Sequence, residues 1–121
     1  MKTKQHVGKF GEDVAVNYLK ENGFAIVDRN VSCRYGEIDI ISVKKNNLHF
    51  IEIRTRIGKH FGSAIDSVTE EKTTKIEMTA EVLLQKNKDW QKYVPFFSVI
   101  AIDETLTGDF AIEFLPDAFG F

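Results

Sequence analysis

Two neighbouring stretches of the chain have the composition of β-strands, and they constrain the fold more than any other feature. Residues Tyr35–Val43 and Leu48–Arg56 are rich in isoleucine and valine at strand spacing, and the segment between them, Lys44–Asn47, is polar and ends in two asparagines. Asparagine tolerates the left-handed backbone that tight turns use. We therefore expect an antiparallel hairpin in which Val43 pairs with Leu48.

This register places charged side chains from both strands on one face of the hairpin. Asp39 lies opposite Glu52, and Glu37 lies opposite Arg54. Directly opposed residues have Cβ atoms ~4.5–5.5 Å apart, so the two carboxylates repel each other. A divalent cation, which prefers hard oxygen ligands, would offset that repulsion. A solvated polar face with a surface pair between Glu37 and Arg54 is the alternative, and the hairpin pattern leaves both open.

The rest of the chain adds two helices and three strands to this hairpin. Apolar residues at helical spacing predict helices over Gly8–Asn22 and Asp66–Gln85. Strand patterns cover three further segments, which are Phe24–Asn30, Phe96–Asp103 and Phe110–Leu115. The order is therefore helix, three strands, helix, two strands. We expect an α/β fold with a mixed central sheet flanked by helices.

Length and charge limit the organisation of the protein. A chain of 121 residues has room for one domain, spanning residues 1–121. The single cysteine excludes an internal disulfide, and no apolar run approaches the ~18 residues of a membrane span, so we expect a cytoplasmic protein without membrane association. Residues 1–60 carry eleven Lys or Arg against seven Asp or Glu, and residues 61–121 carry five against eleven. A basic first half could contact a polyanion, although chance clustering of charge explains these numbers equally well.

Two charged residues of the predicted helices are candidates for a site. Lys72 interrupts the apolar stripe of the second helix, one turn before Ile76. A lysine there either snorkels to the rim of the core or points into a polar pocket, where it would meet the carboxylates or a phosphate. Glu12 lies at the edge of the apolar arc of the first helix, beside Gly8 and Gly11, which would allow another backbone to approach. The sequence is compatible with either a solvated or a partly buried carboxylate at Glu12.

Short motifs follow one another along nearly the whole chain: Gly8-x-x-Gly11-Glu12, Arg29-Asn30, Gly36-Glu37-Ile38-Asp39, Phe50-Ile51-Glu52-Ile53-Arg54-Thr55-Arg56, Phe61-Gly62, Lys72 and Ala118-Phe119. Together they resemble the YraN family of uncharacterised bacterial proteins. That family is similar to Holliday-junction resolvases and, by resemblance, to the PD-(D/E)XK nuclease superfamily. The resemblance implies a restriction-endonuclease-like core, which agrees with the element order expected above.

The resemblance also implies roles for the matching residues. Asp39 and Glu52 would be acidic metal ligands, with the backbone carbonyl of Ile53 beside them and Glu12 completing or supporting the site. Magnesium or manganese bound there would activate water for attack on a phosphodiester. Glu37 belongs to the matching segment but has no settled role.

Arg54 departs from the family pattern, which has a lysine at this position. A lysine can exchange a proton, whereas an arginine stays charged and cannot act as a base. Arg54 can still stabilise charge on a phosphate, and Lys72 is a candidate to supply the missing amine. The catalytic set implied by the resemblance is therefore Asp39, Glu52, Arg54 and Lys72.

The sequence thus favours a nucleic-acid-binding, metal-dependent, endonuclease-like protein that hydrolyses phosphodiester bonds, with DNA, including branched DNA, as the expected partner. Five basic residues are expected to contact the phosphate backbone: Lys9, Arg29, Arg34, Arg56 and Lys59. A non-catalytic nucleic-acid-binding module of the same fold is the alternative, because Arg54 replaces the family lysine. A third hypothesis is a protein-interaction scaffold that uses the aromatic residues Phe114, Phe119 and Phe121. A homodimer is compatible with each of these hypotheses.

Overall fold

The computed structural model of the protein describes residues 4–58, 64 and 68–118. Its elements follow the predicted order of helix, three strands, helix and two strands, and a short 3₁₀ helix, η2, directly precedes the fourth strand. In chain order they are α1 (Lys4–Glu21), β1 (Ala25–Cys33), β2 (Gly36–Lys44), β3 (Asn47–Arg56), α2 (Glu70–Lys86), η2 (Lys88–Lys92), β4 (Val94–Glu104) and β5 (Phe110–Leu115).

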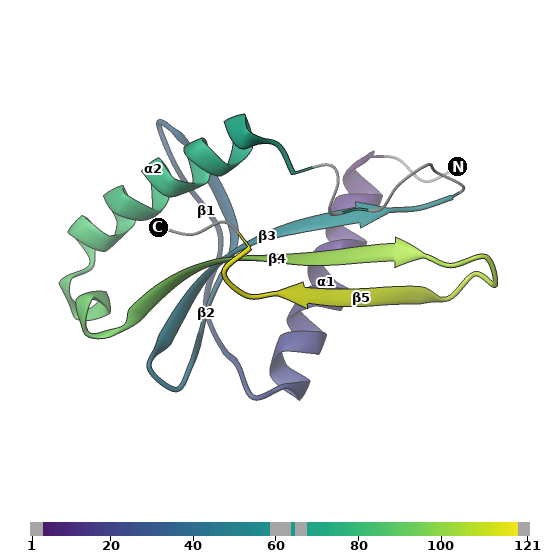
Figure 1. Cartoon of the computed structure of the whole chain (residues 1–121), viewed down its shortest axis with the longest axis horizontal. Helices are drawn as coiled ribbons and strands as arrows, with labels where there is room; N and C mark the ends of the chain where they lie inside the picture. Colours follow the sequence, from purple (N-terminus) through teal and green to yellow (C-terminus); the bar gives the residue numbers. More distant parts are fainter. Residues whose placement is uncertain (1–3, 59–63, 65–67, 119–121) are drawn as a thin grey trace.

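The five strands form one mixed sheet in the order β1-β2-β3-β4-β5 (Figure 1). Strands β3 and β4 are parallel, and every other neighbouring pair is antiparallel. A parallel pair needs a crossover connection, and α2 with η2 lies in the connection between β3 and β4. The predicted mixed α/β fold is therefore confirmed.

The two helices pack against opposite faces of the sheet. Leu19 of α1 contributes to a buried cluster that includes Ile51 of β3 and Ile100 of β4. Ile76 of α2 contributes to a second cluster, on the other face, that includes Phe50 of β3. Because successive residues of a strand point to opposite faces, the adjacent Phe50 and Ile51 each serve a different helix. In the described ranges, neither helix has the length and apolar character of a membrane-spanning segment.

The central hairpin has the register expected from the sequence. Val43 pairs with Leu48, and Lys44 pairs with Asn47. The left-handed residue of the turn is Lys45, with a φ of 56°, rather than an asparagine. Once Lys44 and Asn47 are paired, only two residues are left for the loop, so the position in the loop and not the side chain selects the left-handed backbone.

Several element boundaries differ from the predicted ones. Helix α1 begins four residues earlier than expected, at Lys4. Strand β1 continues to Cys33 because its last residues pair with β2, which a local pattern ending at Asn30 does not reveal. Helix α2 begins at Glu70 and not at Asp66, because the Thr69 side chain accepts a hydrogen bond from the Lys72 backbone N–H and so caps the helix.

Gly11 brings α1 into close contact with β3. A Cβ atom at Gly11 would collide with Thr55 Oγ1 and lie 3.3 Å from Thr55 Cβ. A Cβ atom at Gly8, one turn earlier, would meet nothing within 4 Å. A close approach to the helix backbone is therefore seen at Gly11 but not at Gly8, and it is made by the Thr55 side chain and not by the backbone of β3.

We expect Gly11→Ala to lower the free energy of unfolding by about 1–3 kcal/mol, because the added methyl group overpacks the contact with Thr55. Gly8→Ala is the matched control, and we expect it to leave stability unchanged or raise it by up to about 1 kcal/mol, through better helix propensity. Urea denaturation followed by circular dichroism measures both. Equal destabilisation by the two variants would contradict the close packing at Gly11.

Candidate functional site

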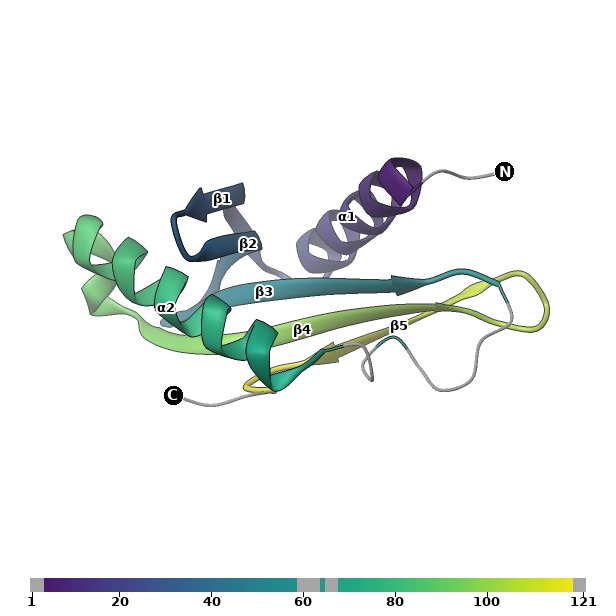
Figure 2. The same cartoon turned by 90° about the horizontal axis from the view of Figure 1, so that it is seen from above.

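Strand β2 separates from β3 at one end of the sheet, and the candidate site lies at this separation. Within the described residues, the backbone pairing of β2 with β3 runs from Lys44–Asn47 to Ile40–Ile51. Beyond this pair a side chain replaces the backbone acceptor of β2, because the Ile53 backbone N–H donates to Asp39 Oδ2 at 2.8 Å. Strand β1 still pairs with β2 beyond this point, as far as Cys33 and Gly36, so the two strands leave the plane of β3 and β4 together (Figure 2).

A pocket of about 450 Å³ lies where β2 separates from β3. Helix α1 and strands β1, β2 and β3 all contribute to its wall, and its lining contains carboxylates and guanidinium groups together. The lining residues are Val7, Gly8, Glu12, Asn30, Glu37, Asp39, Ile53, Arg54, Thr55 and Arg56. The pocket therefore brings together Glu12, Asp39, Ile53 and Arg54, which the sequence singles out individually.

The carboxylates of Asp39 and Glu52 are largely withdrawn from water, and this changes their acidity. Burial raises the pKa of Asp39 to about 6, although the hydrogen bond from the Ile53 N–H favours its charged form. Burial, followed by repulsion from Asp39, raises the pKa of Glu52 to about 7. The charge of Asp39 thus acts on Glu52, although both residues lie just beyond the last backbone pair of β2 and β3, Ile40–Ile51. Each carboxylate is costly to ionise unless a cation lies close by.

Arg54 supplies a positive charge to this pair. Its Nη2 atom lies 2.9 Å from Glu52 Oε1. The cross-strand pair between Arg54 and Glu37, one of the alternatives that the sequence left open, is not seen among the described residues. Strand β2 moves away from β3 at this point, whereas Glu52 lies two residues from Arg54 on the same face of one strand. The Nε atom of Arg54 is buried and has no hydrogen-bond partner among the described residues.

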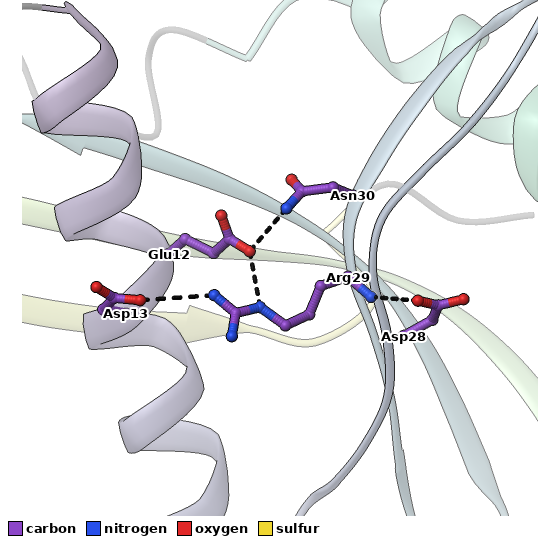
Figure 3. A network of polar contacts seen from close by, with 5 residues as sticks. All are labelled: Glu12, Asp13, Asp28, Arg29 and Asn30. Carbon is purple, nitrogen blue, oxygen red and sulfur yellow. Dashed lines mark hydrogen bonds and ion pairs between the residues drawn. The ribbon is translucent and has the colours of Figure 1, made fainter.

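Glu12 joins α1 to β1 through a network of polar contacts (Figure 3). Its Oε1 atom accepts hydrogen bonds from Arg29 Nε at 2.7 Å and from Asn30 Nδ2 at 2.9 Å. Asp13 Oδ1 lies 3.5 Å from Arg29 Nη2. Glu12 is therefore a partly buried residue at the pocket wall, and Arg29, predicted as a phosphate contact, has its charge balanced by two carboxylates of α1.

Asn30 is a site residue to which the sequence analysis assigns no function. Its backbone is left-handed, with a φ of 52°, a conformation that asparagine accepts more readily than most residues. This backbone lets the side-chain amide reach Glu12 while Asn30 also lines the pocket. The sequence signal was present, because an asparagine inside a strand pattern indicates an irregular backbone, but it predicted a strand end instead.

The residues fit a divalent metal ion only in part. Within the described ranges, no three acidic, histidine or cysteine side chains converge closely enough to hold a metal. Glu12 Oε1 is already engaged by Arg29 and Asn30. Two largely buried carboxylates, Asp39 and Glu52, remain, with the backbone of Ile53 beside Asp39. Such a sparse set of hard oxygen donors suits magnesium, which usually keeps several waters and binds one or two protein carboxylates.

The other predicted basic residues lie at varied distances from this pocket. Lys72 is exposed in the first turn of α2, and its charge lowers the pKa of Glu52 against the larger effect of burial. Arg56 lines the pocket, and Lys9 is exposed on α1. Arg34 is exposed in the turn between β1 and β2, where its Nη2 donates to the Tyr35 hydroxyl at 2.6 Å. Lys59 lies outside the described residues.

The aromatic residues of the scaffold hypothesis are only partly described. Phe114 packs inward, with its ring 5.4 Å from Phe24 and 5.6 Å from His49 between centroids. It therefore belongs to the core beside α1 rather than to a free aromatic surface. Phe119 and Phe121 lie outside the described residues.

The mutual effect of the two carboxylates can be measured directly. Asp39→Asn keeps an oxygen that can accept the Ile53 N–H but removes the charge, so the pKa of Glu52 should fall toward its ordinary value of 4.5. NMR titration of the Glu52 carboxyl carbon in EDTA measures this change. An unchanged pKa of Glu52 would show that burial alone raises it.

The same substitution should change how stability depends on pH. Because the pKa of Asp39 is raised from 3.8 to about 6 in the folded protein, the folded state binds more protons than the unfolded state in that interval. Stability is therefore lost as pH rises through it, and Asp39→Asn should reduce the loss by about 1–2 kcal/mol. Urea denaturation in EDTA at pH 4.5 and pH 7.5 compares the two proteins. Parallel pH profiles would contradict the burial of an ionised Asp39.

Comparison with known proteins identifies relatives along most of the chain. The model of the uncharacterised protein family UPF0102 matches residues 11–102. A UPF0102 protein of Clostridium tetani (strain Massachusetts / E88) is 40% identical over 115 residues, which cover 95% of this chain and 94% of the relative. A UPF0102 protein of Clostridium botulinum (strain Loch Maree / Type A3) is 39% identical over 114 residues, or 93% of both chains. The resemblance seen in the sequence is thereby confirmed, and the chain belongs to the UPF0102 (YraN) family of uncharacterised proteins.

Proposed function

We propose that this protein is a metal-dependent, endonuclease-like protein that binds DNA and hydrolyses phosphodiester bonds. One observation carries the proposal. Two largely buried carboxylates, Asp39 and Glu52, interact electrostatically beside a pocket that is also lined by Arg54 and Arg56. Carboxylates bind hard divalent cations, and guanidinium groups bind phosphate. The pocket therefore combines the two chemistries that phosphodiester hydrolysis requires.

Asp39, Glu52 and the backbone carbonyl of Ile53 would hold magnesium or manganese. When bound, such an ion neutralises charge on a phosphate and makes water a better nucleophile. The burial of both carboxylates supports this assignment, because each pKa is raised by loss of solvation and a bound cation would restore the charged form. Glu12, held by Arg29 and Asn30, would support the site from α1.

The positive groups would bind the phosphate backbone without reading sequence. Arg54 and Arg56 line the pocket, and Lys9 and Arg34 are exposed on neighbouring elements. Contacts of this kind position a nucleic acid but carry little base information. The expected partner is DNA with unpaired or branched segments, whose phosphates can enter a pocket of about 450 Å³ more easily than those of a duplex.

A non-catalytic nucleic-acid-binding protein is a second candidate, and Arg54 favours it. The guanidinium in contact with Glu52 cannot accept a proton, so it cannot serve as a general base. Lys72 is exposed, although its charge is felt at Glu52. Catalysis thus depends on whether Lys72 supplies a proton-exchanging amine or whether the metal-bound water needs no such group.

A cleavage assay with manganese on branched, flapped and single-stranded DNA tests the proposal. We expect metal-dependent cleavage that Asp39→Asn abolishes. If Arg54 impairs the chemistry, Arg54→Lys should raise the rate by about 10-fold or more, since one positioned acid–base group contributes ~10²–10⁴-fold. If Lys72 supplies the amine instead, Lys72→Ala should abolish cleavage while Arg54→Lys changes it only modestly.

The outcomes of this assay separate the two candidates. DNA binding without cleavage by the wild type and by Arg54→Lys would leave the non-catalytic function. Cleavage that survives Asp39→Asn would show that the carboxylate pair is not the site. Absence of both metal binding and DNA binding would exclude both functions.

DNA binding itself should depend strongly on salt. Removing one cationic side chain that binds a phosphate should reduce the slope of log affinity against log salt by about 0.7–0.9. We therefore expect Arg56→Gln to weaken binding of single-stranded DNA and to flatten this slope by about that amount. Fluorescence anisotropy between 50 and 200 mM salt, about the range in which such effects are large, measures it. Affinity that does not change with salt would argue against binding through phosphates.

A further inference from the structure

The ion pair between Arg54 and Glu52 places a guanidinium on a carboxylate that the proposed function assigns to a metal. We propose that Arg54 is an internal counter-ion, which neutralises Glu52 in the free protein, is displaced by a divalent cation and then binds a phosphate in the pocket. This inference rests on the proposed function, because it takes Asp39 and Glu52 as metal ligands. It adds an order of events, in which the metal releases the group that binds phosphate.

The position of the ion pair supports the first part of this inference. Arg54 Nη2 lies 2.9 Å from Glu52 Oε1, and the two side chains are 21% and 12% exposed. A carboxylate this buried needs a positive charge close by in order to ionise. Arg54 supplies that charge from two residues along the same strand. A metal ion that binds Glu52 would supply it instead and would repel the guanidinium.

The hydrogen bonding of Arg54 supports the second part. Its Nε atom is buried and has no hydrogen-bond partner among the described residues. Contact with Glu52 therefore uses Nη2 but leaves another donor of the same planar group unsatisfied, which is unfavourable. A phosphate can accept from Nε and an Nη atom together, in the two-point geometry that guanidinium groups favour. Phosphate thus satisfies Arg54 better than Glu52 does.

The pocket provides the space for this change. Arg54 already lines it, together with Arg56. Release from Glu52 consequently requires a change of side-chain rotamer and no rearrangement of the sheet. A phosphate bound between the two arginines would lie beside Asp39, which lines the same pocket.

Arg54 and the metal ion compete for Glu52, and this competition couples metal binding to phosphate binding. Metal bound at Glu52 frees Arg54 for phosphate, and phosphate bound to Arg54 removes the competitor of the metal. Linkage requires each ligand to raise the affinity of the other by the same factor. The free protein is therefore expected to bind each of them more weakly than the protein that already holds the other.

Calorimetric titration with Mg²⁺ in the absence of DNA tests the displacement. We expect Arg54→Gln to bind Mg²⁺ about 5-fold or more tightly than the wild type, which is a usual size for coupling between sites. Arg56→Gln is the matched control, because it removes the same charge from the same pocket without the contact to Glu52. It should change Mg²⁺ affinity by less than Arg54→Gln does.

Two further measurements keep the test decisive if Arg54→Gln folds poorly. Arg54→Lys retains a charge but not the planar group, so its Mg²⁺ affinity should lie between those of the wild type and Arg54→Gln. In the wild type, NMR of the arginine Nε–H groups should show a shift for Arg54 on addition of Mg²⁺. Dimethyl phosphate, a phosphodiester without base or sugar, should shift the same signal more strongly when Mg²⁺ is present.

The results distinguish this inference from the proposed function. If the wild type binds Mg²⁺ but neither Arg54 variant binds it more tightly, the counter-ion role is overturned while the metal site stands. If neither the wild type nor the Arg54 variants bind Mg²⁺, both are overturned. If only the Arg54 variants bind it, the displacement is supported in its strongest form. An Arg54 signal that is unaffected by Mg²⁺ would overturn the release of the guanidinium.

Discussion

The hydrogen bond from the Ile53 backbone N–H to Asp39 is the interaction on which the site depends. In an uninterrupted sheet this N–H would bond to the backbone of β2. Because a carboxylate accepts it instead, the Ile53 N–H keeps a hydrogen-bond partner at the point where β2 leaves β3. The separation of the strands is therefore compatible with a stable fold, and it gives the space in which the pocket forms.

The same hydrogen bond brings a negative charge into a poorly solvated position. Glu52 on the neighbouring strand adds a second one, so burial raises the pKa of both carboxylates. Arg54 compensates Glu52 through a direct contact. The electrostatics of the site thus follow from the fold itself, since β2 and β3, which contribute to the core, also carry the two carboxylates.

Helix α1 closes the other side of the pocket and is fixed there by two different contacts. Gly11 allows its backbone to approach Thr55 of β3. Glu12, the next residue, accepts hydrogen bonds from Arg29 and Asn30 of β1. Strand β1 is therefore tied directly to α1, and one turn of the helix contacts both β1 and β3.

The sequence by itself determined the element order, the mixed sheet and the register of the hairpin, because alternation and turn length act between neighbours in the chain. Those local rules also predicted Asp39 opposite Glu52, whereas the backbone pairing of β2 with β3 ends one step earlier, at Ile40 and Ile51. Only the tertiary structure decided the partners of the charged groups. Arg54 contacts Glu52 instead of Glu37, and Asn30 of β1 donates a hydrogen bond to Glu12 of α1. These contacts depend on where β2 separates from β3 and on how α1 packs beside β1. Neither feature is encoded by a pattern within a single segment.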